Sequence, residues 1–345
     1  MRIACSVSTS GEWSTTFVCS PLTKEYYRRR PEFQYFPVRS LELAGRHLEL
    51  IDQPRRPWKW CEMSLRISHW IGQVFLIAVF SLFTLPWARS GTDQPLRVLP
   101  LPAAHAHNDY EHKRPLFDAL DHGFCSVEAD VFLVKGELLV GHTFLQLQRE
   151  RKLESLYLDP LRARIKQNGG KVYKDGPVLW LLVDVKTEAK STYQALDKVL
   201  AKYSDIVSVV KEGKFAEKAV TVVVSGNRAK AEAAAQEVRY AGIDGRAADL
   251  DSTEPVHLLP WISESWTAHF RWRGDGPMPD VERAKLRDFV RKAHKHGRRV
   301  RFWATPERVE VWKELRAADV DLINTDKLAE LQSFLLENAT KSEKN

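Results

Sequence analysis

The stretch AHAHNDYEHKRPLFDALDHGFCSVEADVFLVKGELLVGHT, residues 104–143, contains the features that decide the fold. Polar and acidic side chains stand in it at the ends of apolar runs. His107 follows the first run, Glu128 and Asp130 lie inside the second, and His142 ends the third. An α/β barrel builds its active site in this way, from side chains at the ends of its strands.

Glu128 and Asp130 belong to the segment VEADVFL, which has the composition of a β-strand. The two-residue period of a strand sends both side chains to the same face. Two carboxylates on one face repel each other unless a cation lies between them. A hard divalent ion prefers oxygen ligands, and the amide carbonyl of Asn108 is a neutral ligand of this type. The alternative is a solvated strand face, but histidines on both sides of the pair favour a metal site.

Short β-branched runs alternate with amphipathic helical patterns from Arg97 onward, which is typical of β/α units around a parallel sheet. We expect strands at residues 97–105, 125–133 with a hairpin to 137–143, 177–186, 219–225, 242–250, 257–263, 299–305 and 320–325. Helices are expected at residues 114–123, 192–203, 228–242, 280–297, 306–319 and 327–338. Eight strands in about 250 residues predict a single closed (β/α)8 TIM-type barrel over residues 97–338. The longest connection, residues 144–170, is a candidate cover for its mouth.

Asp184 and Lys186 end the strand-like segment PVLWLLVDVK. They are two residues apart, so they share a face, and the barrel fold places them at the same mouth as the other polar groups. A metal ligand beside a phosphate-binding cation explains an acid and a base in an apolar strand. The alternative is a buried ion pair, which is expensive to keep without a function.

The first 90 residues differ from the rest of the chain. Residues 1–62 lack sustained periodicity and are expected to form a non-globular extension. Residues 63–90 have the layout of a secretory signal peptide that begins at Met63, with an apolar run at 71–85 too short for a comfortable transmembrane span. The alternatives are an uncleaved membrane anchor and a buried apolar helix. We expect a secreted or periplasmic barrel, or one anchored to a membrane through residues 71–85.

The composition bounds the remaining possibilities. A chain of 345 residues with 44% hydrophobic residues is long enough for one barrel plus an extension, or for two ordinary domains. The net charge of +7 is spread along the chain, which allows an anionic substrate or a membrane surface, and no nucleic-acid partner is expected. The sequence does not indicate whether the protein is a monomer or an oligomer. The four cysteines form no C-x-x-C pair, which argues against a zinc knuckle and a disulfide framework.

The motifs H-N-D-Y, E-x-D, G-H-T and V-D-V-K occur in this order, starting at His107. Their order resembles that of the phosphatidylinositol-specific phospholipase C-like phosphodiesterase superfamily, which includes glycerophosphodiester phosphodiesterases and sphingomyelinase D-like enzymes. With HAHNDY, LLVDVKTE, RFWATP and VDLINTD, the chain is most similar to the family named "altered inheritance of mitochondria protein 6". The resemblance covers residues 101–334. The Glu-Asn-Thr segment of glycerophosphodiester phosphodiesterases is absent.

The resemblance implies a metal-dependent phosphoric diester hydrolase. Its substrate would be a small-molecule or lipid-headgroup phosphodiester, either a glycerophosphodiester or a phospholipid, with membrane-surface contact as one option. The implied catalytic residues are His107, His142 and Lys186. The implied ligands of one divalent cation, Ca²⁺ or Mg²⁺, are Asn108, Glu128, Asp130 and Asp184.

Charge placement suggests how such a site works. One histidine takes a proton from the nucleophile while the other protonates the leaving oxygen, and a cation with Lys186 stabilises the charge that develops on the phosphoryl oxygens. The sequence does not assign the acid and the base between the two histidines. It also leaves open whether water or a substrate hydroxyl attacks.

Two other functions remain open. His105 and His107 form an H-x-H pair, which also begins the metal site of amidohydrolases and of histidinol-phosphatase-type phosphoesterases. Such sites recruit further histidines, and the later ones here are His257, His269, His294 and His296. None of these ends a strand convincingly, so we interpret His105 as structural. The second alternative is a barrel that binds a phospho-ligand without turnover.

Tryptophans cluster in the C-terminal half, at positions 261, 266, 272 and 303. They could form an aromatic wall for a sugar or lipid group, or they could belong to the core. Trp303 is expected at the same rim as the metal site. Asp326 is expected to cap the last helix.

Overall fold

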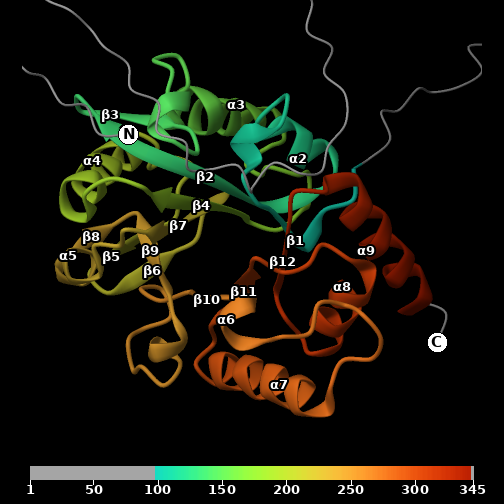
Figure 1. The fold of residues 1–345 in the computed structure, drawn as a ribbon. Coiled ribbons are helices and arrows are strands. Elements are labelled where there is room, and N and C mark those ends of the chain that lie inside the picture. Colours follow the sequence, from blue (N-terminus) through green and yellow to red (C-terminus); the bar gives the residue numbers. More distant parts are fainter. Residues whose placement is uncertain (1–97, 343–345) are drawn as a thin grey trace, which may run out of the picture. The chain divides into compact units, whose positions relative to one another are not determined.

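The protein is described by a computed structural model that covers residues 98–342, in which eight parallel strands close into a barrel (Figure 1). The barrel strands are β1 (Leu101–Ala106), β2 (Phe124–Val134), β4 (Leu179–Val185), β7 (Val220–Gly226), β9 (Ala241–Gly245), β10 (Trp261–Ser265), β11 (Arg299–Trp303) and β12 (Leu322–Thr325). Each strand pairs in parallel with the next, and β1 closes the ring by pairing with both β2 and β12. The predicted (β/α)8 barrel is confirmed.

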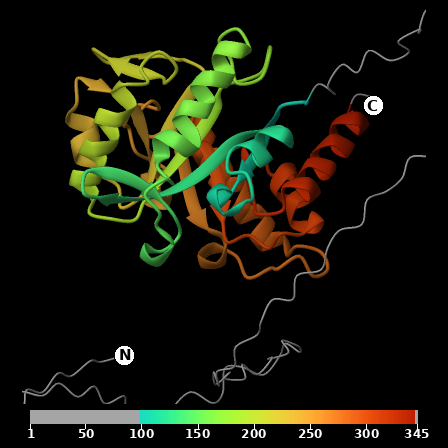
Figure 2. The same ribbon diagram turned by 90° about the horizontal axis from the view of Figure 1, so that it is seen from above.

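Helices surround the strands, as Figures 1 and 2 show from two directions. The helices are α2 (Phe117–Asp121), α3 (Asp159–Gln167), α4 (Ala189–Ala201), α5 (Lys230–Ala235), α6 (Trp266–His269), α7 (Asp280–Lys295), α8 (Val309–Ala317) and α9 (Leu328–Ser342). The longer ones follow the expected amphipathic pattern. In α7, for example, Leu286, Phe289, Val290 and Ala293 are buried at spacings of three and four residues.

The helix expected at residues 228–242 is shorter than predicted. α5 ends at Ala235, and Val238–Arg239 instead forms β8, which pairs with β5 (Val209–Lys211). Together with β6 (Lys214–Ala216) these strands form a small antiparallel sheet beside the barrel (Figure 1). The helical pattern of the alanine-rich segment was misleading because pairing with β5, which is distant in sequence, decides the conformation after Ala235.

The connection at residues 144–170 is more regular than expected. It contains a π-helical turn, Glu154–Leu158, followed by α3. Leu158, Leu161 and Ile165 from this segment are buried in the core. The connection therefore includes the crossover helix of a β/α unit, which its many charged residues concealed in the sequence.

The inside of the barrel is divided into an apolar floor and a polar mouth. Trp180, Leu182, Val223, Trp261 and Leu322 pack together inside the ring of strands, separately from the core between strands and helices. Water is excluded from the amino-terminal half of the barrel by this packing. The mouth above this floor lies at the carboxyl-terminal ends of the strands, where the active sites of this fold are found.

Several sequence-based expectations lie outside the described residues. These are the extension at 1–62, the signal-like segment at 63–90 and three of the four cysteines, whereas Cys125 is buried as a free thiol. Within residues 98–342, none of the helices has the length and apolar character needed to cross a membrane. β3 (Glu137–Val140) completes the described sheet as an antiparallel extension of β2.

Candidate active site

Three carboxylates converge at the carboxyl-terminal end of the barrel. Glu128 and Asp130 share a face of β2, and the parallel register places Asp184 of β4 directly beside Asp130. One oxygen from each of the three side chains lies within 4.8 Å of the others. The expected convergence of Glu128, Asp130 and Asp184 therefore occurs, and β-strand register is its cause.

The electrostatics of this cluster fit a bound cation. Burial raises the pKa of Asp184 to about 6, and the nearby charges of Glu128 and Asp130 add to the shift. Burial and Glu128 also raise the pKa of Asp130, although Lys186 opposes this shift. The Oδ1 atom of Asp130 is buried without a hydrogen-bond partner. An oxygen-only donor set with an unused buried lone pair suits a hard divalent cation such as Ca²⁺ or Mg²⁺.

Glu128 is held by two side chains that line the interior of the barrel. Its Oε2 atom accepts hydrogen bonds from Nη1 of Arg301, at 2.7 Å, and lies 3.2 Å from Nε2 of His105. Burial alone would raise the pKa of Glu128, but Arg301 and His105 outweigh it and hold the pKa well below its usual range. Glu128 therefore stays ionised at the base of the site.

Lys186 lies between the two aspartates. Its Nζ atom is 3.0 Å from Oδ2 of Asp130 and 3.3 Å from Oδ2 of Asp184. Burial would lower the pKa of Lys186, but the two carboxylates outweigh it and raise the pKa. The lysine is therefore a fixed cation at the mouth, placed to attract an anionic group.

His142 is oriented by Tyr110 and Asp130. Its Nδ1 atom is 3.0 Å from the Tyr110 hydroxyl and 3.3 Å from Oδ2 of Asp130. The Tyr110 hydroxyl donates to the same Asp130 oxygen, at 2.6 Å. Because the Tyr110 hydroxyl donates its proton to Asp130, its oxygen can accept from Nδ1–H of His142, which leaves Nε2 to exchange a proton with a bound group.

His107 is oriented by Asp326, a residue from the segment after β12. Their Nδ1 and Oδ1 atoms lie 2.8 Å apart. Burial would lower the pKa of His107, but the hydrogen bond to Asp326 and the charge of Glu128 outweigh it and raise the pKa. The helix-cap role expected for Asp326 is not seen among the described residues, because its carboxylate pairs with His107 rather than with a backbone amide of α9.

Asn108 lies at the same mouth in the left-handed backbone region, with φ of 46°. Its amide is 2.8 Å from the Tyr110 hydroxyl and 3.0 Å from Nδ1 of His107. The Asn108 amide therefore lies between His107 and Tyr110, the residue that contacts His142. Its assignment as a metal ligand stays a prediction.

A pocket of about 700 Å³, its open side included, joins these groups. It is lined by His107, Asn108, Glu128, His142, Asp184, Lys186, Ser225, Gly226, Arg246, Arg301 and Trp303. Gly226 is essential to its shape, because a Cβ atom there would lie 2.0 Å from Oδ1 of Asp184.

The sequence analysis did not identify Tyr110, Arg246, Arg301 or the pairing role of Asp326. Tyr110 stands within the H-N-D-Y motif, so its proximity to the site was the available signal. Arg301 shares a strand face with Trp303, and this period of two was a usable signal as well. Arg246 is held by Asp244 and Ser225, at 2.9 and 3.1 Å, and nothing in its local sequence distinguishes it from other arginines.

The tryptophans divide between the two expected roles. Trp261, Trp266 and Trp272 are buried, whereas Trp303 is 41% exposed and lines the pocket. Of these four tryptophans, Trp303 alone forms part of a wall around the site.

His105 is structural, as expected, because it is fully buried and its Nδ1 atom lies 2.7 Å from the Ser126 hydroxyl. Burial, with the charge of Arg301, lowers the pKa of His105 to about 4. Of the later histidines, His269 pairs with Glu264 and His294 pairs with Asp321. None of them lines the pocket among the described residues, which weighs against an H-x-H metal site.

Comparison with known proteins agrees with the resemblance drawn from the motifs. Residues 92–241 match the family described as "AIM6-like phosphodiesterase domain", and residues 299–329 match the "Glycerophosphoryl diester phosphodiesterase family". "Altered inheritance of mitochondria protein 6 homolog" from Arthroderma benhamiae is 28% identical over 271 residues, which cover 70% of this chain and 86% of that protein.

"Altered inheritance of mitochondria protein 6" from Eremothecium gossypii is also 28% identical, over 68% of this chain and 69% of that protein. A crystal structure of a glycerophosphodiester phosphodiesterase from Parabacteroides distasonis aligns with a TM-score of 0.43 and 14% identity. That alignment covers 69% of this chain and 98% of that one.

Proposed function

This chain carries an AIM6-like phosphodiesterase domain, and we propose that it is a metal-dependent phosphoric diester hydrolase that works by His/His acid–base catalysis. The observation that carries the proposal is a cluster of three carboxylates beside one pocket that two oriented histidines and Lys186 also line. Positioned acids, bases and charges of this kind are what phosphodiester hydrolysis needs.

Glu128, Asp130 and Asp184 would hold the cation, with Asn108 as a further candidate ligand. When bound, a divalent cation supplies Lewis-acid stabilisation of the charge on the phosphoryl oxygens. Lys186 contacts two of the same carboxylates, so it lies where it can bind a phosphoryl oxygen directly. Together these groups would position the phosphodiester between the two histidines.

The two histidines divide the proton transfers. The hydrogen bond to Asp326 raises the pKa of His107, which favours this histidine as the group that would protonate the leaving oxygen as the phosphorus–oxygen bond breaks. His142 would accept the proton of the attacking oxygen through Nε2 as the new phosphorus–oxygen bond forms. Each transfer typically contributes roughly 10²- to 10⁴-fold in rate.

A lipid substrate is favoured by the loop that follows His142. Phe144 and Leu145 are 67% and 96% exposed, and they stand immediately beyond the catalytic histidine. Exposed apolar side chains at the rim of a site suit contact with a lipid surface. We therefore favour a phospholipid-type diester over a small glycerophosphodiester. We also propose that the barrel is secreted or periplasmic through the signal-like segment 63–90, or anchored to a membrane through residues 71–85, which N-terminal sequencing of the protein from its native host would test.

Hydrolysis of bis(p-nitrophenyl) phosphate, with and without Ca²⁺ or Mg²⁺, tests the proposal. The parent should require a cation, and His107→Ala and Glu128→Gln should each lose at least roughly 10²-fold in rate. His294→Ala is the matched control, since His294 pairs with Asp321 at the same 2.8 Å but lies away from the pocket. An active protein that tolerates both site substitutions would exclude this site. A folded parent that binds the diester without turnover would support the phospho-ligand-binding alternative.

A further inference from the structure

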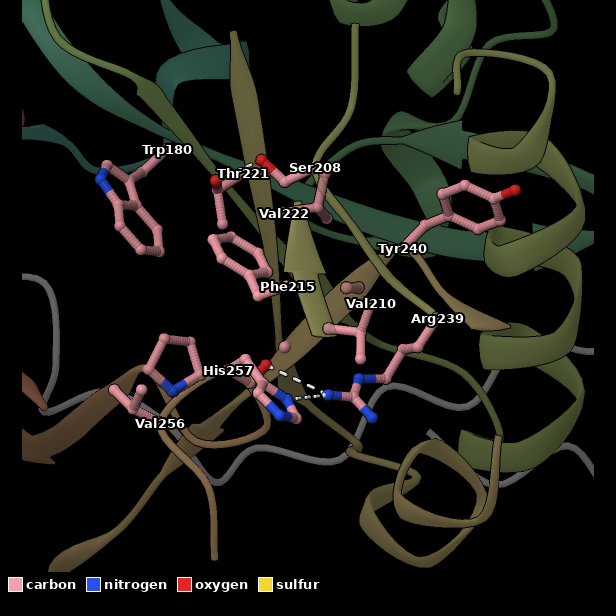
Figure 3. Close-up of a pocket in the computed structure, with 13 residues that line it drawn as sticks. Trp180, Ser208, Val210, Phe215, Thr221, Val222, Arg239, Tyr240, Val256 and His257 are labelled. Carbon is pink, nitrogen blue, oxygen red and sulfur yellow. Dashed lines mark hydrogen bonds between the residues drawn. The ribbon is translucent and has the colours of Figure 1, made fainter. Parts of the chain in front are cut away.

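A second pocket lies at the opposite end of the barrel from the active site. It is bounded by the amino-terminal ends of β4, β7 and β9 and by the small sheet of β5, β6 and β8 (Figure 3). With its open side included, the pocket spans about 600 Å³. None of its lining residues belongs to the active-site pocket.

The wall of this pocket is almost entirely apolar. Trp180, Val210 and Phe215 face it, and Figure 3 shows their side chains around the same space as that of Val256. The Arg299 guanidinium lies over the Trp180 ring, 5.2 Å from its centroid. The hydroxyls of Ser208 and Thr221 bond to each other at 2.9 Å. These two hydroxyls therefore have a hydrogen-bond partner within the wall and need none from a ligand.

One end of the pocket holds a buried cation without an anionic partner. Arg239 is 4% exposed, and its guanidinium donates to Nδ1 of His257 at 2.7 Å and to the carbonyls of His257 and Ala233. Its Nε atom is buried without a hydrogen-bond partner. Within residues 98–342, no carboxylate reaches ion-pair distance of this guanidinium. Burial lowers the pKa of Arg239, and the more distant Tyr193 and Glu254 offset this shift only in part.

A buried cation at the end of an apolar cavity is costly unless a counter-ion arrives with a ligand. The adjoining cleft on the other side of Arg239 contains Glu212, Glu237 and Glu254. Glu212 and Glu237 are exposed and solvated by water, while Glu254 is half-buried and acts on Arg239 only from beyond ion-pair distance. An anionic group would therefore stabilise Arg239, and a hydrocarbon chain would fit the apolar wall.

We propose that this pocket binds an amphipathic carboxylate, such as a medium- or long-chain fatty acid. The hydrocarbon chain lies between Trp180, Phe215 and Val256, and the carboxylate pairs with Arg239. His257 already accepts from Arg239 through Nδ1, so it holds the guanidinium in place. The site is independent of the phosphodiesterase site and of the function proposed for it.

Calorimetric titration of the full chain with decanoate at pH 8 tests this proposal, with decylammonium and decanol as probes of charge. Decanoate should bind with one site per chain and more tightly than either probe. Arg239→Gln should weaken decanoate at least tenfold and leave decanol nearly unchanged, while Arg239→Lys should restore part of the affinity. Equal binding of decanoate by the parent and a folded Arg239→Gln variant would overturn the proposal, as would tighter binding of decylammonium.

A second variant guards against misfolding of the first. Phe215 is 44% exposed at the lip of the pocket, so Phe215→Glu should fold and should weaken decanoate by placing a like charge there. Val281→Glu, at an 82% exposed position of α7, is the matched control and should bind as the parent does. If decanoate does not bind the parent, or binds Phe215→Glu unchanged, the assignment is wrong. If His142→Ala no longer binds decanoate, the ligand lies at the candidate active site, and this result would also contradict the assignment.

Discussion

Two histidines of this site depend on carboxylates that sit behind them. Asp326 contacts Nδ1 of His107, and Asp130 lies beside Nδ1 of His142. In each case the side chain behind the ring determines which nitrogen carries the proton. Sequence inspection located both histidines through the motifs that contain them. It missed the function of Asp326 because that residue is 219 positions away from His107 and meets it only when the barrel closes.

Asp326→Asn tests the role of this pairing. The amide cannot hold a proton on His107 as a carboxylate does, so the rate should fall by roughly 10- to 100-fold, a part of what acid catalysis contributes. The variant should also lower the pH at which activity declines on the alkaline side, because His107 then loses its proton more easily. The pH–rate profile on bis(p-nitrophenyl) phosphate measures both effects. Asp288→Asn, on the exposed face of α7, should leave the profile unchanged, and a similar loss there would contradict the account.

Gly226 is the second residue on which the site depends. It has φ of +67°, and a Cβ atom would contact Oδ1 of Asp184. Gly226→Ala should therefore displace this carboxylate and weaken the binding of Mn²⁺, as measured by calorimetry, at least tenfold. Gly213→Ala is the matched control, because Gly213 has φ of +71° but nothing within 4 Å of the added atom. If both variants bind the cation equally well, Asp184 is not a ligand.

Asp109 makes the stability of the fold depend on pH. Its Oδ2 atom accepts from the Leu116 amide and the Tyr157 hydroxyl, while Oδ1 is buried without a partner. Burial raises the pKa of this carboxyl to about 7 from the ordinary value of 3.8. Between about pH 4 and pH 7 the folded state therefore keeps a proton on Asp109 that the unfolded state releases. The stability that this proton contributes is fully present below about pH 4 and is lost as the pH rises to about 7.

Asp109→Asn should remove this dependence. The free energy of unfolding of the variant should exceed that of the parent near pH 8, by up to roughly 4 kcal/mol at about 1.4 kcal/mol per pKa unit. The difference should shrink as the pH falls toward 4. Urea denaturation at several pH values measures it. If the difference in free energy of unfolding between variant and parent stays constant with pH, Asp109 does not titrate in this range.

At the scale of elements, the loop after β3 connects the site to its surroundings. Strand β3 delivers His142 to the mouth, and Phe144 and Leu145 follow in a short 3₁₀ turn that a Thr143–Gln146 capping box fixes. The turn therefore presents both apolar side chains to solvent beside His142. We propose that they contact a phospholipid surface.

Replacing Phe144 and Leu145 together by serine tests this interpretation. Hydrolysis of phospholipid in vesicles should fall at least fivefold, because the enzyme loses apolar contact with the surface, while hydrolysis of soluble bis(p-nitrophenyl) phosphate should persist. Val281→Ser, which removes an exposed apolar side chain from α7, should affect neither activity. Equal rates on vesicles for the parent and the double variant would favour a soluble diester as the substrate.

Elements with a strong local pattern could be predicted from the sequence. The E-x-D strand β2, the apolar strand β4 and the amphipathic helix α7 all lie where periodicity places them. α3 and β8 could not be found, since charged side chains mask the first and pairing with β5 determines the second. In the site, too, the sequence pointed to residues within motifs, such as Glu128 and His142, but not to Arg301.

The whole molecule explains why the acidic residues meet. Closure of eight parallel strands brings the carboxyl-terminal ends of β1, β2, β4, β11 and β12 to one mouth. The apolar floor below it excludes water, which strengthens each charge interaction above. Three carboxylates face the cations Lys186 and Arg301, which leaves one negative charge among these five side chains. A divalent cation and a phosphodiester anion together would balance that charge.

The central claim is that Glu128, Asp130 and Asp184 bind one divalent cation, and crystals soaked in Mn²⁺ test it most directly through anomalous diffraction. The account predicts a single strong peak within coordination distance of all three carboxylates, and its loss in Asp130→Asn crystals. A map with no peak among these carboxylates, in crystals of an active protein, would contradict the account.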